Sequence, residues 1–196
     1  MNELDKIYNN IWEMLLEGAL KSKHEFHLPS ISTVQNNLPD SRIVVLRRVI
    51  TEDRLLIHHT DLRSTKVDQL KANPSMCWLF YSKELKTQLR IYGKGKIHTD
   101  DKLADEQWEA SQVLSRRCYL TEPSPGTETD LNHNGIPDKY RVTLPTLEET
   151  EIGRKNFAVI SCTVMSIDWL SLKSTGHSRA KFEVNDDQIK SNWIVP

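Results

Sequence analysis

The chain has 196 residues, of which 38% are hydrophobic and 27% charged, so its composition is neither disordered nor fibrous. Its 26 basic and 27 acidic residues leave a formal net charge of −1, which excludes a global positive field that would attract nucleic acid or membranes. No stretch reaches the apolar length of a membrane span. We therefore expect one domain over residues 1–196 that binds neither nucleic acid nor membrane.

The first 20 residues predict an amphipathic helix, because apolar residues recur there at spacings of three and four. These residues are Leu4, Ile7, Tyr8, Ile11, Trp12, Leu15, Leu16 and Ala19. Glu3, Asp5 and Lys6 occupy the place where a signal peptide would have an apolar segment, so we expect a cytoplasmic protein. The three cysteines, Cys77, Cys118 and Cys162, are widely spaced, and we expect reduced, mostly buried thiols.

Runs rich in β-formers follow this helix. The pattern predicts strands at 26–34, 42–49, 54–59, 76–81 and 87–98, with a turn at 36–40. The glycines in the last run indicate a bulge or a close approach of backbones. A helix is expected at 64–72, with Ser64 at its N-cap and Asn73-Pro74 as its end.

The second half contains another helix and a long irregular segment. Asp100 and Asp101 are expected to cap a helix that runs to about residue 114. Residues 123–145 are rich in Pro, Gly, Asn and Thr, and such a long loop is functional, mobile or both. Further strands are predicted at 156–165, 167–172 and 180–184. Because helices do not alternate with strands, we predict a mainly β (α+β) fold, a closed or partly closed antiparallel barrel with peripheral helices.

Two arginines on the second predicted strand are candidate ligands for an anion. Arg42 and Arg47 are five residues apart, an odd spacing that places them on opposite faces of a regular strand. Either guanidinium could reach a phosphate or a carbonyl-rich ring. A strand at the sheet edge with charged ends explains the pattern equally well.

The segment after the third strand has the character of a phosphate-binding turn. His59 and Thr60 end the strand, and Ser64, Thr65 and Lys66 open the next helix. Free N–H groups at a helix N-terminus attract anions, and the hydroxyls and the ammonium add donors. Hydroxyl residues also cap helices for purely structural reasons, so this segment alone does not decide between the two interpretations.

Two more candidates lie further along the chain. Gln88 can both donate and accept hydrogen bonds, as the edge of a flavin or pyrimidine requires. Trp169 precedes Arg179 by ten residues, with His177 between them, so the indole could pack on a planar ligand while the guanidinium pairs with its polar edge. A core tryptophan and a surface arginine are the plain alternative.

In this order, the segments resemble the pyridoxamine 5'-phosphate oxidase family, and more closely its uncharacterised flavin-binding branch than the vitamin B6 oxidases. The resemblance covers roughly residues 26–119 and 156–182. It implies a split β-barrel of the FMN-binding type that forms a homodimer, with FMN at the subunit interface and a small-molecule substrate. The FMN-binding residues implied are Arg42, Arg47, His59, Thr60, Ser64, Thr65, Lys66, Gln88, Ser115, Trp169 and Arg179, with Gln88, Trp169 and Arg179 coming from the second subunit.

The resemblance also implies which activity the chain performs. His177 matches a substrate residue of the B6 oxidases, but Thr175 stands where those enzymes carry an arginine. Near residues 108–115 no tyrosine and arginine for the substrate phosphate are found. We therefore expect an FMN-dependent oxidoreductase of another substrate. The alternatives are a true pyridoxamine 5'-phosphate oxidase and a flavin-binding protein without turnover.

One segment has the spacing of a calcium-binding loop. Residues 130–138 match the first nine positions of such a loop, but Arg141 replaces the final bidentate glutamate. We expect an Asx-rich surface turn with Asn134-Gly135 at its corner. His58, His59 and His98 could be read as a metal site, but adjacent strand residues point to opposite faces, so we expect no metal there.

Overall fold

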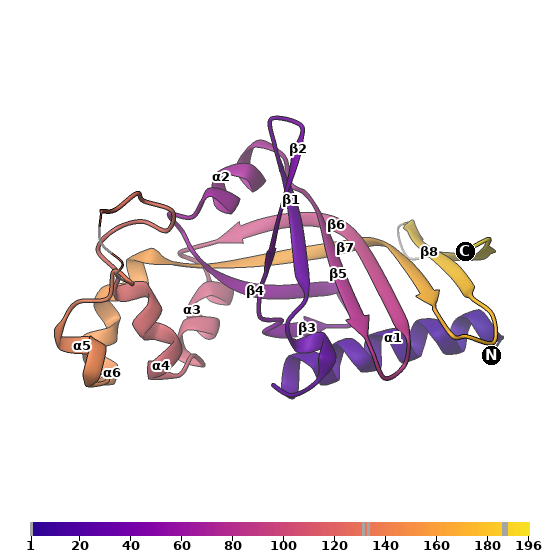
Figure 1. Ribbon diagram of the computed structural model, residues 1–196, viewed down its shortest axis with the longest axis horizontal. Coiled ribbons are helices and arrows are strands. Elements are labelled where there is room, and N and C mark those ends of the chain that lie inside the picture. Colours follow the sequence, from indigo (N-terminus) through magenta and orange to yellow (C-terminus); the bar gives the residue numbers. More distant parts are fainter. Residues whose placement is uncertain (1, 131, 133, 186–187) are drawn as a thin grey trace.

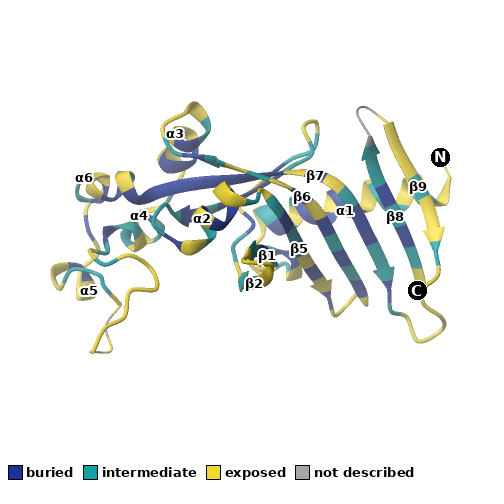
Figure 2. Ribbon diagram, turned by 90° about the horizontal axis from the view of Figure 1, so that it is seen from above, coloured by how far each residue is buried: buried dark blue, intermediate teal, exposed yellow. Residues whose placement is uncertain are grey.

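The computed structural model describes residues 2–130, 132, 134–185 and 188–196, and their centre is one antiparallel sheet. The strand order is β2-β1-β5-β6-β7-β4-β3 (Figure 1), and β8 and β9 extend the sheet beside β7 (Figure 2). Within the described residues the path does not close, because β2 and β3 at its two ends do not pair. The expected mainly antiparallel fold with peripheral helices is confirmed, as an incompletely closed barrel.

The strands have the following bounds. They are β1 Ser30–Gln35, β2 Leu38–Ile43, β3 Arg48–Ile50, β4 Leu55–Asp61, β5 Ser75–Ser82, β6 Thr87–His98, β7 Phe157–Ser171, β8 Ser178–Asn185 and β9 Gln188–Ile194. The helices are α1 Glu3–Leu20, α2 Thr65–Ala72, α3 Lys102–Glu109, α4 Val113–Arg116, α5 Lys139–Val142 and α6 Leu147–Thr150. The described residues also form the 3₁₀ turns η1 Glu25–His27, η2 Arg117–Leu120 and η3 Glu151–Asn156.

Helix α1 covers one face of the sheet, and its amphipathic spacing is the reason. A capping box between Asn2 and Asp5 starts the helix. Its apolar side, with Ile11 and Leu15 fully buried, packs on the inward residues of β5 to β8. The smaller helices α3 to α6 gather at the opposite end of the molecule, where a second hydrophobic cluster forms around Trp108 (Figures 1 and 2).

Strand β7 joins the two ends of the molecule. Along one edge of β7, its first half pairs with β4 and its second half pairs with β8. Along its opposite edge, β7 pairs with β6. The register of β6 and β7 shifts between Tyr92 and Gly93, so the expected bulge is confirmed. A Cβ at Gly93 would lie 2.3 Å from the carbonyl oxygen of Thr163, which explains the glycine.

Several predicted boundaries are wrong. The strand expected at 42–49 is broken at 44–47, and the strands expected at 156–165 and 167–172 are one strand, β7. The helix expected from Asp101 to residue 114 ends at Glu109 and restarts at Val113. Residues 26 and 27, expected at the start of a strand, belong to η1. Among the described residues, no helix is long and apolar enough to cross a membrane.

Candidate functional site

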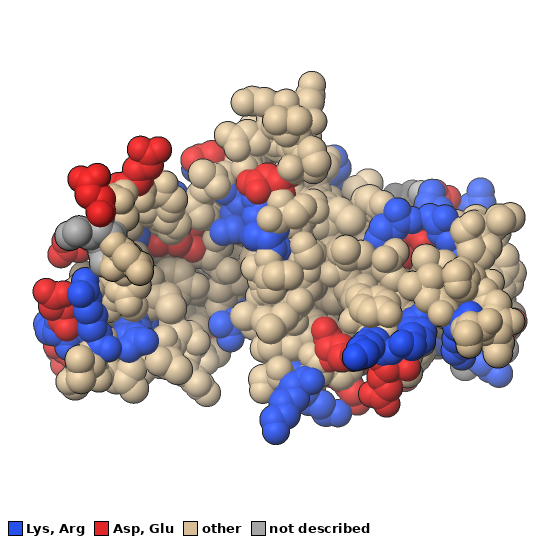
Figure 3. Space-filling view, in the orientation of Figure 1, with Lys and Arg blue, Asp and Glu red and all other residues tan. Residues whose placement is uncertain are grey.

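A cavity of about 760 Å³ lies where the β2–β3 connection, the end of β4 and the loop after η2 meet. Figure 3 shows Lys and Arg atoms gathered beside this hollow, between the end of the molecule that carries helices α3 to α6 and the β1–β2 hairpin. Its volume is within the range of small-molecule and cofactor sites. The predicted ligand residues that line it are Arg42, Arg47, His59, Thr60, Ser64 and Lys66.

The floor of the cavity is a cluster of hydroxyl groups around one ammonium group. Nζ of Lys66 donates to Oγ1 of Thr60 at 2.9 Å and to Oγ of Ser64 at 3.2 Å. Oγ of Ser64 donates to the carbonyl oxygen of Asp61 at 2.7 Å and makes no capping bond to α2. The first N–H groups of α2 are thus left without this side-chain acceptor, beside a cation.

The positive charge of this cluster is not neutralised from within. Lys66 forms no ion pair with any residue that the structure describes. Its burial, and then the repulsion of nearby Arg42, lower the pKa of its ammonium group, although the coulombic effects of Asp61 and Asp40 oppose this. An anion bound here would offset both the burial of Lys66 and its repulsion by Arg42, because it would favour the charged ammonium group.

Arg42 is held by a polar network behind the cavity. It donates from Nη1 to Oγ1 of Thr33 at 2.5 Å and from Nη2 to Oε1 of Gln69 at 3.2 Å, and it pairs with Asp40. Gln69 is buried in α2, and it also accepts a hydrogen bond from Thr33. The network ties β1, β2 and α2 together, so Arg42 has a fixed position at the cavity wall.

His59 and Arg47 form the opposite wall. Nε2 of His59 lies 3.1 Å from Oε1 of Gln107. Burial lowers the pKa of His59 to about 4, with a smaller contribution from Arg47 against the opposing bond to Gln107. The imidazole is therefore neutral at neutral pH. Arg47 is exposed and forms no ion pair with a described residue.

His58, the neighbour of His59, faces the other way. It is fully buried, its ring meets that of Trp78 edge-on at 5.3 Å, and neither ring nitrogen has a hydrogen-bond partner. Burial lowers its pKa to about 3, with smaller contributions from Lys66, His59 and Arg42. The expectation that adjacent histidines take opposite faces is confirmed.

Sequence reasoning missed the group that positions the loop over the cavity. Arg63 pairs with Asp61 through Nη2 at 2.7 Å and Nε at 3.0 Å. Its Nη1 donates to the carbonyl oxygens of Thr121 and Glu122, both at 3.1 Å. The residues that follow line the cavity, among them Pro123, Ser124, Pro125, Gly126, Thr127, Glu128 and Thr129. The only available signal was a charged pair placed directly before a helix.

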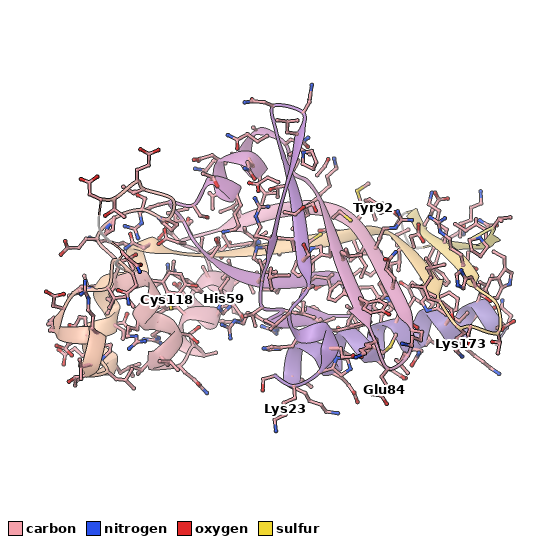
Figure 4. The ribbon with its side chains drawn as sticks, viewed as in Figure 1. Lys23, His59, Glu84, Tyr92, Cys118 and Lys173 are labelled. Carbon is pink, nitrogen blue, oxygen red and sulfur yellow. The ribbon has the colours of Figure 1, made fainter. Side chains whose placement is uncertain are left out.

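Thr65 and Ser115 were expected to be ligands but do not line this cavity. Thr65 is exposed and lines none of the cavities described here. Ser115 lines an adjoining pocket, which shares Arg47 and His59 with the main cavity. Cys118 and Tyr119 line the main cavity and were not predicted to do so. In Figure 4, His59 and Cys118 lie close together at the α3–α4 end of the sheet.

The remaining predicted residues lie at the far end of the sheet, where Figure 4 shows Lys173. Trp169 and His177 line a groove beside α1, and Trp169 shares its sheet face with buried Leu89. Gln88 and Arg179 are cross-strand neighbours of Leu170 and therefore lie on the other face. Within one chain, these residues do not meet the cavity.

Arg179 at this far end is engaged in a charge cluster. It donates to Asp168 from Nη2 at 2.7 Å and from Nε at 3.0 Å, and Nη2 of Arg90 donates to the same carboxylate at 2.5 Å. Although burial acts in the opposite direction, the hydrogen bond from Arg179 and the charge of Arg90 lower the pKa of Asp168. This carboxylate is thus ionised between two guanidinium groups.

Among the described residues, no group of three or more His, Cys, Asp or Glu side chains could hold a metal ion. In the loop at 130–138, positions 131 and 133 lie outside the described residues. Oδ1 of Asn134 accepts from the N–H of Ile136 at 3.1 Å, and Gly135 has a φ of +71°.

The three cysteines are free, but only Cys162 is buried, so the expectation of mostly buried thiols is wrong.

Comparison with known sequences gives one family. The sequence model of the pyridoxamine 5'-phosphate oxidase, FMN-binding domain, matches residues 9–99. Pyridoxine/pyridoxamine 5'-phosphate oxidase from Leptospira interrogans is 37% identical over 183 residues, which cover 90% of this chain and 81% of that protein. Pyridoxine/pyridoxamine 5'-phosphate oxidase 2 from Arabidopsis thaliana is 34% identical over 132 residues, 59% of this chain, and the match spans 64% of its own length.

Comparison with solved structures gives the same fold. A pyridoxamine 5'-phosphate oxidase-related, FMN-binding protein from Nostoc punctiforme superimposes with a TM-score of 0.74 at 21% identity, covering 96% of this chain and 97% of that one. PhzG from Burkholderia lata, solved with tetrahydrophenazine-1-carboxylic acid, gives a TM-score of 0.71 at 14% identity, with 97% and 92% covered. These matches establish the split-barrel fold.

Proposed function

Because this chain belongs to the FMN-binding pyridoxamine 5'-phosphate oxidase family, we propose that it is a cytoplasmic FMN-dependent oxidoreductase acting on a small molecule. The observation that carries the proposal is the set of cations, hydroxyls and a helix N-terminus around one cavity of about 760 Å³. The family fixes FMN as the cofactor. We further propose that residues 1–196 act as one domain.

The donors at the cavity floor fit a phosphate monoester. Lys66, Thr60 and Ser64 converge on one point beside the start of α2, and Lys66 has no carboxylate partner among the described residues. These groups would hold the FMN phosphate by charge-assisted hydrogen bonds. Arg42, fixed by Thr33 and Gln69, would add a second cation beside it.

The protein would bind and orient the cofactor and exclude water. FMN supplies hydride-transfer chemistry when it is bound, so no side chain is required as a nucleophile. His59 is neutral and fixed by Gln107, so it would serve as a hydrogen-bonding wall. The loop that Arg63 holds at Thr121 and Glu122 would cover the cofactor.

We propose that two copies of the chain complete each site. The face that carries Gln88 and Arg179 is not covered by α1, and it exposes Leu79, Tyr81 and Tyr92. Such a face on an antiparallel sheet suits a two-fold contact, which would bring the second copy's Gln88 and Arg179 to the cofactor. Trp169 and His177 would reach it from the strand end. Sedimentation of the FMN-loaded protein should give a dimer, and an FMN-loaded monomer would contradict this assembly.

The names of the relatives favour a second candidate, oxidation of pyridoxamine 5'-phosphate itself. Two features oppose it. Thr175 offers no guanidinium beside His177. Arg116, a cation in the segment after α3, is buried against Glu151 at 2.5 Å and the carbonyl oxygen of Trp108, so it is not available to a substrate. We expect very slow turnover of pyridoxamine 5'-phosphate in a coupled peroxide assay.

Reduction of the bound flavin tests the proposal. FMN-loaded protein mixed anaerobically with NADH or NADPH, and then with candidate organic donors, should lose its flavin absorbance with at least one donor. FMN that remains oxidised with every donor would favour a flavin-binding protein without turnover. Turnover of pyridoxamine 5'-phosphate on the order of one per second would favour the second candidate.

A further inference from the structure

Residues 121–129, which follow η2, form a wall of the proposed flavin cavity. The seven consecutive residues 123–129 line this cavity together with Thr121. In Figure 1 the loop between α4 and α5 lies beside the turn that leads into α2, and hydrogen bonds from Arg63 join the two segments. The 121–129 loop therefore meets the cavity near its floor of Lys66 and Ser64.

Arg63 anchors the start of this loop. Its Nη1 donates to the carbonyl oxygens of Thr121 and Glu122, both at 3.1 Å, and its Nη2 donates to Oγ1 of Thr121 at 3.1 Å. The guanidinium also pairs with Asp61, from Nε at 3.0 Å and from Nη2 at 2.7 Å. All three nitrogens are thus engaged, so the planar guanidinium is fixed in position.

The anchor and the floor of the cavity belong to one turn of the chain. The carboxylate of Asp61 accepts a hydrogen bond from the backbone N–H of Arg63 at 2.8 Å. The carbonyl oxygen of Asp61 accepts from Oγ of Ser64 at 2.7 Å, and Ser64 in turn accepts from Nζ of Lys66. A loop anchored at this turn begins beside the place where Lys66 would hold a phosphate.

Two features restrict the loop beyond its anchor. Pro123 and Pro125 have their φ angles fixed by the pyrrolidine ring. Gly126 follows with a φ of +86°, which turns the chain. The loop therefore has few alternative conformations while Arg63 holds its start.

FMN and flavin adenine dinucleotide (FAD) differ only at and beyond their first phosphate. FMN ends there, whereas FAD continues into a second phosphate and an adenosine. With the first phosphate on Lys66, this extension would run against the 121–129 loop. The loop also brings the carboxylate of Glu128 into the cavity lining, and Glu128 forms no ion pair with a described residue. A second phosphate would thus meet both occupied space and a like charge.

We propose that Arg63 determines cofactor specificity, because it holds the 121–129 loop at the phosphate end of the cavity and so restricts the site to FMN and excludes FAD. Arg63 is a positioning residue, since its guanidinium is engaged by Asp61 and by the loop. This inference rests on the proposed flavin site, with Lys66 as the phosphate ligand.

Calorimetric titration of the flavin-free protein with FMN and with FAD tests this specificity. The unaltered protein should bind FMN at least about tenfold more tightly than FAD. Arg63→Ala should reduce this ratio by at least about fivefold, because FAD binds more tightly once the loop is released. A merely structural defect would weaken FMN, FAD and riboflavin alike and leave the ratio unchanged.

Three further variants separate the anchor from local charge. Asp61→Asn combined with Arg63→Ala removes both charges of the pair, so the net charge of the turn is kept, and it should behave as Arg63→Ala does. Arg48→Ala is the matched control, because Arg48 pairs with Glu106 at 3.5 Å outside the cavity, and it should keep the ratio. Glu128→Lys leaves the anchor in place and should reduce the ratio at low salt. An unchanged ratio in both Arg63→Ala and Glu128→Lys would overturn the proposal.

Proteolysis shows whether the loop has been released. A glutamyl endopeptidase cleaves after glutamate, and the loop contains Glu122 and Glu128. Cleavage at these positions should be faster in Arg63→Ala than in the unaltered protein. Equal cleavage would show that Arg63 does not hold the loop, and faster cleavage with an unchanged ratio would show that the loop does not select the cofactor. Either result would contradict the proposal.

The titrations of the unaltered protein separate this inference from the function beneath it. If FMN and FAD bind equally well, the specificity assignment fails and the flavin site stands. If neither flavin binds, the proposed function fails first.

Discussion

The two cationic regions of the molecule differ in how their charges are balanced. In the proposed flavin cavity, Lys66 and Arg47 form no ion pair with a described residue. At the far end of the sheet, Arg90 and Arg179 share the carboxylate of Asp168 at 2.5 and 2.7 Å. Both regions look equally basic in the sequence, and only the structure separates them.

This difference indicates two kinds of role. Lys66 is half-buried and has no counterion among the described residues, which raises the energy of the folded chain, and an anionic ligand would relieve that cost. A carboxylate held between two guanidinium groups is already satisfied and fixes the strands that carry it. Binding of the FMN phosphate should therefore depend on the first region. The second region should stabilise the free protein, and Asp168 would also hold Arg179 in place for the cofactor of a second copy.

The largest expected effect is on the phosphate contact of Lys66. Lys66→Ala should weaken FMN roughly tenfold to a hundredfold, because a hydrogen bond to a charged group contributes about 1.5–3 kcal/mol. Riboflavin, which lacks the phosphate, should bind as before. Flavin fluorescence titration measures both affinities.

Lys71→Ala is the matched control for this comparison, since Lys71 lies on the same helix and pairs with Asp68 at 3.3 Å. It should leave both affinities unchanged. An equal loss of FMN and riboflavin in Lys66→Ala would place the phosphate elsewhere.

The next effect concerns acid stability at the cavity end. Burial lowers the pKa of His58 to about 3 and of His59 to about 4, below the ordinary value of 6.5. Between those values the unfolded chain binds more protons, so the stabilisation is complete above about pH 6.5 and is lost as the pH falls. Each histidine should lower the free energy of unfolding by about 1.4 kcal/mol per pH unit in that window.

Replacing one of these histidines sharpens the test. His58→Leu should reduce the pH dependence of urea unfolding between pH 6 and 4 by about 1.4 kcal/mol per pH unit. His59→Gln gives a second reading if the first variant folds poorly. A pH dependence identical to that of the unaltered chain in both variants would show that these groups do not titrate as their burial requires.

A smaller effect is expected at the far end of the sheet. Asp168→Asn leaves two arginines with one neutral acceptor and should lower the thermal midpoint of the free protein by a few degrees. Glu183→Gln, which loses a more exposed pair with Lys181, should shift it less. Calorimetric scans of both variants decide this. A larger loss in Glu183→Gln would reverse the ranking.

The smallest expected effect is at Thr65. This residue opens α2, but its side chain is exposed and lies outside the cavity, in contrast to buried Ser64. Thr65→Ala should change FMN affinity less than about twofold, whereas Ser64→Ala should weaken it several-fold. Titration of the two variants side by side tests whether the cavity, or the sequence motif, defines the ligand set.

The sequence predicted which residues line the cavity better than it predicted how they are arranged. The turn from His59 to Lys66 could be recognised as a candidate because hydroxyls, a lysine and the free N–H groups of a helix start together suit an anion, although hydroxyls also cap helices. Arg42 and Arg47 were expected on opposite faces of one strand. They reach one cavity because the chain leaves the strand at 44–47, a break that the apolar run Val44–Val45–Leu46 conceals.

Other misses have similar physical causes. Strand β9 is polar and lies at the sheet edge, so its sequence QIKSNWI has no hydrophobic alternation. Trp169 and Arg179 were grouped by their place in the chain. Cross-strand pairing puts them on different faces, and only the register of β7 with β8 reveals this. The bridge from Arg63 to Thr121 joins segments 58 residues apart, which no local pattern predicts.

The relative affinity of the unaltered protein for FMN and riboflavin tests the central claim most directly. The two ligands share the isoalloxazine and ribityl groups and differ in the phosphate alone. If the unpaired charge of Lys66 and the start of α2 hold that phosphate, FMN should bind at least about tenfold more tightly, and the ratio should fall as salt concentration rises. Equal affinities at low salt would contradict the account.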